Sequence, residues 1–451
     1  MSFLLALWLG LLCICLAMSW RRFGSGTLLL AYFLGLSLIH VPGAYIFTGA
    51  APGLSGREET TVGFQITLIA FAATLCGAAV MRFVQGGFSG AVVGAVHIPR
   101  RNSSRLVGVS RPLLFVGLGV FFLALPIAGL VRSLTSVISP LATMIIIAFW
   151  AIIHNVIVHR DYKLLIFPIL FLPLLPFSTL FFGGFIGFGI YWVISIFSFY
   201  FVQAGTIQKL AILAVSPLLL SLGLSFGNAY FEKRDEVREA VWYQDAPAAE
   251  RLNSILAIAD KFELFDLNNP DHLKYANARL NQNFLIGTGV GRYRSGMSEL
   301  EYGGTVPLWS FIPRVLWPSK PEVGGGRDVV ERFAGIRFRE GTSVGAGQPL
   351  EFYANFGLFG VVLGSFFWGM LIEFYDGRLA RAFRSEDIRL IIRYGLPGIT
   401  LLQPGGNLLE ILIGFVGAIV IARPATWLLR RAFEFGQQRK RSIGRSPVRV
   451  G

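Results

Sequence analysis

The fold of this chain is decided by residues 164–203, which read LLIFPILFLPLLPFSTLFFGGFIGFGIYWVISIFSFYFVQ and contain no charged side chain. A helix needs about 20 apolar residues to cross the hydrocarbon core of a bilayer, so this run predicts two spanning helices in a hairpin. The glycine pair in Phe182-Gly183-Gly184 predicts the turn between them. The stretch is typical of a polytopic membrane protein.

The composition of the whole chain agrees with that interpretation. The mean hydropathy is +0.61, and charged residues make up only 15% of the 451 residues. A soluble domain carries roughly 25% charged residues. Because backbone polar groups inside lipid must pair within the protein, apolar runs of this length indicate helices. We therefore expect an all-α polytopic membrane protein.

Apolar run lengths predict about eleven transmembrane helices. Eight lie within residues 1–230, at about 3–19, 27–48, 64–84, 112–131, 138–158, 164–179, 184–203 and 210–230. Three more lie within residues 351–428, at about 351–374, 390–403 and 409–428. A large polar segment, residues 231–350, separates the two groups, and a basic tail, residues 429–451, follows the last helix.

The formal net charge of +14 is concentrated in short loops and in the tail. An N-terminus outside the cell places Arg21-Arg22, the other short basic loops and the tail in the cytoplasm, as the positive-inside rule requires. The polar segment 231–350 then lies outside. The first apolar run has its basic residues after it, the reverse of a secretory signal, so we expect it to remain as a helix. This charge pattern indicates contact with membrane lipids and no nucleic-acid partner.

No metal site and no cofactor are expected. No two of the five histidines have the spacing of a ligand pair. The glycine-rich stretches of the polar segment are not nucleotide fingerprints, because neither lies between a strand and a helix. Arg82 and Glu373 lie near the cytoplasmic ends of spans, where we expect their charges to extend to the interface.

Two amphipathic helices are expected inside the polar segment. Apolar residues recur at helical spacing from Leu252 to Phe262. Asn269-Pro270-Asp271 is a helix start, and the apolar residues from Leu273 to Phe284 would share one face of the helix that follows.

Arginines in the same segment lie beside glycine-rich runs. Arg292 and Arg294 follow residues 287–291, GTGVG, and four further arginines precede residues 341–347, GTSVGAG: Arg327, Arg332, Arg337 and Arg339. Arginine forks bind phosphate bidentately, and amides in glycine turns add donors. The alternative is that these arginines pair in a solvated loop with nearby acids such as Asp328 and Glu331.

Residues 311–321, FIPRVLWPSKP, hold a different kind of arginine. Residues 306–317 offer Arg314 no carboxylate, and an arginine in apolar surroundings indicates an anion-binding site. Lys320 follows closely. We expect the anion to be a lipid-linked phosphate.

The ninth predicted span begins with EFYANFG, residues 351–357. Glu351 either complements the helix dipole or serves as a general base for a sugar hydroxyl. Tyr353 and Asn355 are candidates for hydrogen bonds to a sugar, although an interfacial aromatic belt explains Tyr353 equally well.

The two runs together, FIPRVLWPSKP at 311–321 and EFYANFGLFG at 351–360, resemble the Wzy-type oligosaccharide repeat-unit polymerases of O-antigen and exopolysaccharide synthesis. The resemblance is specific over roughly residues 307–360, and the first two hundred residues are similar only in hydropathy. It implies a GT-C-like helical architecture in the bacterial inner membrane. It also implies inverting, metal-independent transfer of a glycan from undecaprenyl diphosphate on the outer face.

Carried onto this chain, the resemblance implies that Arg314, with Lys320, binds the donor diphosphate. Glu351 would be the base for the acceptor hydroxyl, and Arg292 or Arg294 would hold a second lipid phosphate or the acceptor. The implied partners are undecaprenyl-diphosphate-linked oligosaccharide, a chain-length regulator and a flippase.

Other classes of protein remain as alternatives. The O-antigen ligases rely on an external histidine, and His272 does not lie in a matching context. A flippase or transporter of lipid-linked sugars would carry cations inside the spans and duplicated halves. A non-catalytic component of a polysaccharide export complex would not need clustered arginines near the outer interface.

Overall fold

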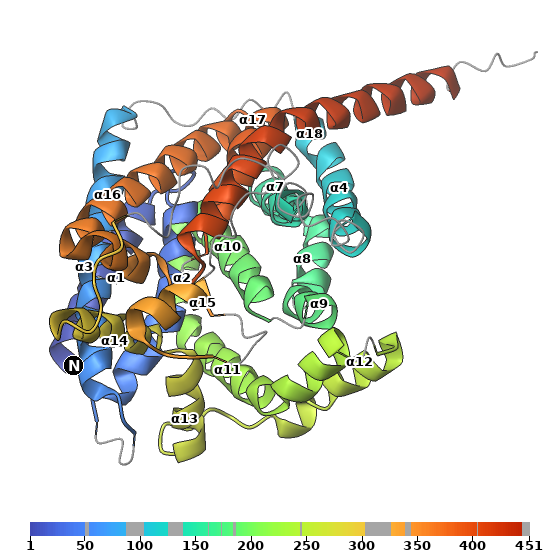
Figure 1. Cartoon of the computed structure of the whole chain (residues 1–451). Helices are drawn as coiled ribbons and strands as arrows, with labels where there is room; N and C mark the ends of the chain where they lie inside the picture. Colours follow the sequence, from blue (N-terminus) through green and yellow to red (C-terminus); the bar gives the residue numbers. More distant parts are fainter. Residues whose placement is uncertain are drawn as a thin grey trace, which may run out of the picture.

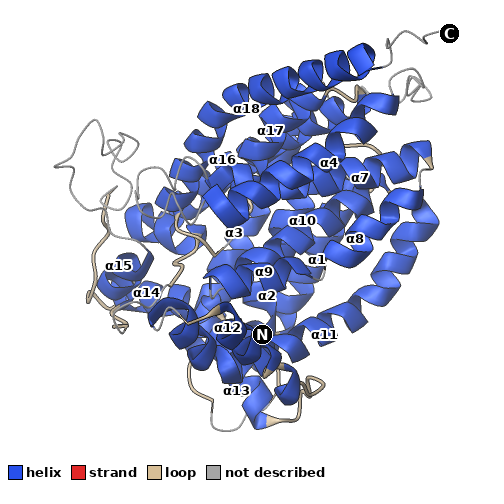
Figure 2. Ribbon diagram, turned by 90° about the vertical axis from the view of Figure 1, so that its right-hand side faces the viewer, coloured by secondary structure: helices blue, strands red, loops and turns tan. Residues whose placement is uncertain are grey.

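The computed structural model describes residues 1–49, 54–86, 103–124, 139–160, 162–172, 174–183, 186–243, 246–302, 326–338, 344–403 and 405–443. Every regular element within these ranges is helical, as Figure 2 shows. The prediction of an all-α protein is therefore confirmed for this part of the chain.

The elements before the polar segment are α1 (Ser2–Ser19), α2 (Thr27–Ile46), α3 (Arg57–Val84), α4 (Ser103–Gly119), η2 (Val120–Ala124), α7 (Met144–His159), η3 (Tyr162–Leu165), α8 (Ile166–Phe171), α9 (Leu174–Gly183), α10 (Gly187–Gln203) and α11 (Thr206–Arg238). The later ones are η4 (Glu239–Tyr243), α12 (Ala248–Leu256), η5 (Ala259–Lys261), α13 (Pro270–Arg279), α14 (Gln282–Arg294), α15 (Gly326–Val329), η7 (Val330–Ala334), α16 (Gln348–Arg384), α17 (Ile388–Thr400) and α18 (Leu408–Ile443).

Seven helices in the described ranges are long and apolar enough to cross a bilayer. They are α1, α2, α3, the helix Ser139–His159 that contains α7, the helix Thr206–Val241 that contains α11, α16, and the first part of α18. Most of the apolar surface of α11, including several exposed leucines, contacts no other part of the protein. A helix of this kind needs lipid to cover its surface. The described part of the chain is thus helical with seven helices of membrane length, and the eleven predicted spans stay a prediction.

The remaining predicted spans are shorter or broken. In residues 164–203, α9 ends at Gly183 and packs against α10, which begins at Gly187, whereas Gly184 of the predicted turn lies outside the described residues. The predicted first arm of the hairpin is divided into η3, α8 and α9. A proline stands at position 173; proline lacks the N–H that a helix needs and disfavours helical geometry in the preceding residue. α17 has 13 residues, fewer than the ~20 that a straight crossing requires.

The helices run between two ends of the molecule. At one end, here called the carboxylate end, the α1–α2 turn meets the last turns of α3 and α16. At the other end, here called the α14 end, α14 lies beside the start of α3, and α18 begins. Figure 1 shows the N-terminus near α14 and α13, and α18 running toward the opposite end. Arg21 and Arg22, in the α1–α2 turn, therefore lie at the end toward which α18 runs, and the predicted orientation of the chain in the membrane stays a prediction.

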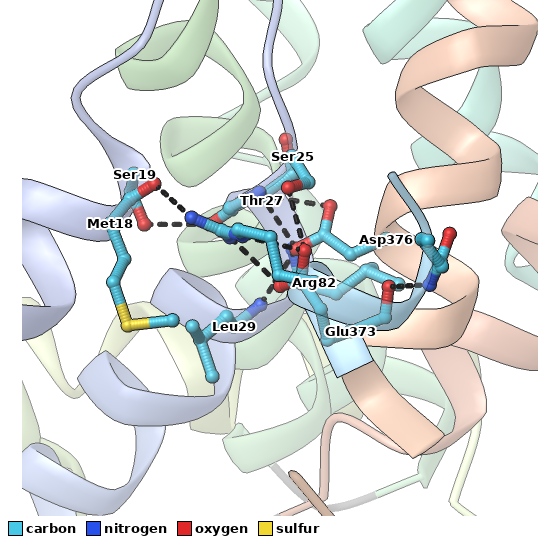
Figure 3. A network of polar contacts seen from close by, with 11 residues as sticks. Met18, Ser19, Ser25, Thr27, Leu29, Arg82, Glu373 and Asp376 are labelled. Atoms are coloured by element: carbon cyan, nitrogen blue, oxygen red, sulfur yellow. Dashed lines mark hydrogen bonds and ion pairs between the residues drawn. The ribbon is translucent and has the colours of Figure 1, made fainter. Parts of the chain in front are cut away.

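At the carboxylate end, a buried ion pair joins α3 to α16 (Figure 3). The Nε and Nη2 atoms of Arg82 each donate to Glu373 at 2.8 Å, and Glu373 is 2% exposed. Asp376 accepts the N–H groups of Gly26 and Leu28 at 2.9 Å and so caps the start of α2. The expectation that Arg82 and Glu373 extend to the interface is wrong, because each is satisfied by the other inside the bundle.

At the α14 end, part of the polar segment is docked onto the spanning helices. Gly287 of α14 lies so close to α3 that an added Cβ would sit 1.7 Å from the carbonyl oxygen of Glu59. Gly63 of α3 lies in the same way against the carbonyl of Asn283. Small residues let two helix backbones approach each other. The prediction that residues 287–291 form a glycine turn with free amides is wrong, because they lie within α14.

The polar segment differs from the prediction in its boundaries as well. α11 continues to Arg238, past the predicted limit at residue 230, and α16 already begins at Gln348. The first amphipathic helix ends at Leu256. The second begins at Pro270 with an Asn269 cap, as predicted, but ends at Arg279, and Phe284 belongs to α14. α18 continues through Ile443, into the predicted tail.

Candidate functional site

The candidate site is built on a short helical unit, α15 followed by η7, that packs against α14 and α16. One side of this unit is buried with α14 and α16, through Val329, Val330, Phe333 and Ala334. Its other side presents Arg327 and Glu331. This amphipathic arrangement holds charged side chains beside the end of α14, where Arg292 lies.

These elements form a pocket of about 450 Å³. Its lining consists of three arginines, one carboxylate, one glycine and one aromatic residue: Arg292, Arg327, Arg337, Glu331, Gly335 and Phe338. Two predicted substrate-binding residues, Arg292 and Arg327, are therefore brought together although they are far apart in sequence. Three guanidinium groups against one carboxylate leave the pocket positively charged, which suits an anion.

Arg327 is held in place from two directions. Its Nε donates to Glu331 Oε1 at 2.8 Å, and its Nη2 donates to the carbonyl of Phe338 at 3.1 Å. The same Glu331 oxygen accepts the Phe338 N–H at 3.0 Å. Arg327 therefore pairs with Glu331, as the solvated-loop alternative predicted, and also lines the pocket, while phosphate binding by Arg327 stays a prediction.

Arg292 is held by backbone groups. Its Nη2 donates to the carbonyl of Met297 at 3.2 Å, and its Nε is buried with no partner in the described part of the chain. The guanidinium lies against Gly335, where an added Cβ would sit 2.7 Å from Arg292 Cζ. Gly335 also has φ +71°, a left-handed conformation that costs other residues about 1–2 kcal/mol.

Gly335→Ala is therefore expected to weaken anion binding by displacing Arg292. We expect the affinity of purified protein for inorganic pyrophosphate, measured by calorimetry, to fall roughly tenfold, equivalent to about 1.4 kcal/mol. Gly296→Ala is the matched control, because Gly296 has φ +74° with nothing within 4 Å of an added Cβ. Equal losses in the two variants would mean that backbone strain, and not the position of Arg292, lowers the affinity.

The other predicted site residues in the described ranges lie away from the pocket lining. Arg294 is exposed in the last turn of α14. Tyr353 is buried, with its ring packed near those of Tyr293 and Phe333. Asn355 is buried and donates to the carbonyl of Glu351 at 2.8 Å.

Glu351 occupies a defined structural position. It is 2% exposed, and its Oε1 accepts the N–H of Leu408, the first residue of α18, at 2.7 Å. A carboxylate at a helix start satisfies a free N–H and complements the helix dipole. The Glu351 carboxylate thus complements the dipole at the start of α18 as well as that of α16, the helix that carries it.

Arg314 and Lys320 lie outside the described residues. The described residues on either side of their segment are anchored near the site. The N–H of Tyr302 donates to the carbonyl of Asn355 at 3.2 Å. Gly326 lies against Asn407, next to the start of α18. Both flanks therefore approach the first turns of α16 and the pocket.

Sequence reasoning missed the roles of Gly335 and Phe338. Arg337 was recognised only as one cation of a cluster, and Glu331 only as a pairing partner. Their spacing follows no helical or strand period, because η7 ends at Ala334 and residues 335–338 have no regular secondary structure. The density of arginines between 327 and 339 was the available signal.

Fold and site together define a helical membrane protein with an arginine-lined pocket at one end of the bundle. No protein-family model, no curated protein sequence and no solved structure matches this chain.

Proposed function

We propose that this chain is a membrane glycosyltransferase that polymerises undecaprenyl-diphosphate-linked oligosaccharide repeat units on the outer face of the bacterial inner membrane. The pocket of Arg292, Arg327 and Arg337 carries this proposal, because a diphosphate is the group such a site would bind. The resemblance of residues 311–321 and 351–360 to repeat-unit polymerases supplies the reaction. In the proposed topology eleven segments cross the bilayer, and the pocket faces outward.

In the proposed reaction, an acceptor hydroxyl attacks the anomeric carbon of the donor sugar while the bond to the diphosphate breaks. Undecaprenyl diphosphate leaves with the electron pair. Arginines stabilise the negative charge that develops on this leaving group. Arg292, Arg327 and Arg337 would hold the phosphates, with Arg314 and Lys320 as further candidates from the adjoining segment.

Glu351 is the proposed acceptor of the hydroxyl proton. A carboxylate within hydrogen-bond reach of the acceptor hydroxyl can take up its proton. The contact with Leu408 N–H engages only Oε1. Substitution by glutamine would preserve that hydrogen bond but could not take up a proton.

Replacing Arg292 by glutamine is expected to shorten the glycan made in cells that lack the native gene. Losing one charge-assisted contact costs about 1.5–3 kcal/mol, or roughly a 10- to 100-fold lower rate. The measurement is the ladder of glycan lengths on a gel at matched protein level. Glu351→Gln is tested in the same way. If Glu351 is the base, cells with this variant should make single repeat units and no longer glycan.

Arg234→Gln is the control for general loss of charge from the polar segment. Arg234 pairs with Asp235 at 3.0 Å in α11 and does not line the pocket. This variant should make a full ladder. A full ladder from Arg292→Gln would overturn the proposed function and leave an export-complex role as the alternative.

A further inference from the structure

The arginine pocket contains a carboxylate that an anion site does not need. Glu331 lines the pocket, and both of its protein hydrogen bonds, from Arg327 Nε and from Phe338 N–H, reach the same oxygen, Oε1. Among the described residues no donor reaches Oε2. The Arg327 guanidinium, helped by the Phe338 N–H, holds the pKa of Glu331 below its usual range. The group is therefore negatively charged at neutral pH.

A fixed negative charge in this position repels a bare phosphate. Glu331 is not the only group that orients Arg327, because Arg327 Nη2 also donates to the carbonyl of Phe338 at 3.1 Å. A carboxylate oxygen is, however, a strong acceptor for hydroxyl groups. Glu331 Oε2 is therefore suited to a ligand that carries hydroxyls next to its phosphates.

Two further features of the pocket suit a sugar. Phe338 is the one aromatic residue in the pocket lining, and the C–H face of a sugar packs well on an aromatic ring. The volume of about 450 Å³ lies within the ~300–1,000 Å³ of small-molecule sites. It is many times the ~30 Å³ that a water molecule occupies in the liquid, so phosphate groups alone would leave much of it unfilled.

We infer that Glu331 is a specificity-determining residue that selects a sugar-linked phosphate over a bare one. Glu331 Oε2 accepts a hydroxyl of the sugar next to the diphosphate, Phe338 packs on that sugar, and the three arginines hold the phosphates. This inference rests on the proposed function, because it assigns the sugar side of the same pocket.

The test measures two properties of Glu331→Gln that move in opposite directions. Binding of inorganic pyrophosphate to the purified full chain should tighten a few-fold, because a repelling charge is removed. In vesicles supplied with the lipid extract of cells lacking this gene, the KM for lipid-linked repeat units should rise roughly tenfold, with a smaller change in kcat, as expected for one lost charge-assisted hydrogen bond. Parallel losses in both properties would overturn the inference, since Glu331 would then only position Arg327.

Phe338→Leu gives a second, independent readout. The contacts of Phe338 with Arg327 and Glu331 are made by its backbone, so this variant should bind pyrophosphate like the unmodified protein. Its KM for lipid-linked units should rise several-fold. An unchanged KM would contradict the assigned sugar contact.

Failure of this inference is distinguishable from failure of the proposed function. If Arg292→Gln retains both the full ladder and pyrophosphate affinity, the polymerase proposal fails. If Arg292→Gln loses both, while Glu331→Gln and Phe338→Leu leave KM unchanged, the anion site stands and only the sugar assignment is wrong.

Discussion

Glu373→Ala is expected to destabilise the protein by about 3–5 kcal/mol, the cost of leaving a buried charge without its partner. Arg82 gives two hydrogen bonds of 2.8 Å to Glu373, and Ser25 Oγ donates to the same carboxylate at 2.7 Å. Without Glu373, the guanidinium would keep its hydrogen bond to the carbonyl of Met18, near the end of α1. The measurement is the thermal midpoint of the purified protein in detergent, together with its monodisperse fraction.

Two control variants test whether the loss of stability comes from breaking the buried Arg82–Glu373 pair or from removing any acidic residue. Glu236→Ala removes an exposed partner of Lys233 and should change stability by no more than about 1 kcal/mol. The double variant Arg82→Met, Glu373→Leu removes both charges and should recover most of the loss. If the double variant is as unstable as Glu373→Ala, the pair is not what joins α3 to α16.

Gly287→Ala is expected to separate α14 from α3. An added Cβ would sit 1.7 Å from the carbonyl oxygen of Glu59, and this atom belongs to a helix backbone that cannot turn away. Overpacking of this kind costs about 1–3 kcal/mol and at times more. Because Arg292 lies on the same helix, we expect pyrophosphate affinity to fall together with the thermal midpoint.

The matched control for this variant is Gly291→Ala in the same helix. No atom lies within 4 Å of an added Cβ at Gly291, and alanine favours helix over glycine by about 0.8–1 kcal/mol. This control should be as stable as the unmodified protein or more so. A stable Gly287→Ala protein with normal pyrophosphate affinity would show that the close contact is not needed to place Arg292.

Run length was enough to predict the long helices. α1, α2, α3, α16 and the first part of α18 fall close to the predicted spans, because an apolar run of about 20 residues has few alternatives in a bilayer. The same rule was less successful in residues 164–179. Hydropathy does not register a proline break, and there the structure has η3, α8 and α9 in place of one helix.

Residue type predicted part of the site but not its geometry. Arg292 and Arg327 were recognised as phosphate-binding candidates, and the structure brings both into one pocket. Tyr353 and Asn355 were recognised by the same reasoning but are buried and do not line the pocket. Sequence spacing could not show which of these four residues line the pocket, because it does not show which side of α16 packs on η7.

The sequence by itself determined the class of protein, since the hydropathy of each segment depends only on its own residues. Only the tertiary structure decided how Arg82 is neutralised, why residues 287–291 are glycine-rich, and where Glu331 lies relative to Arg292. Each of these depends on a contact between segments far apart in the chain, and such contacts form only when helices pack.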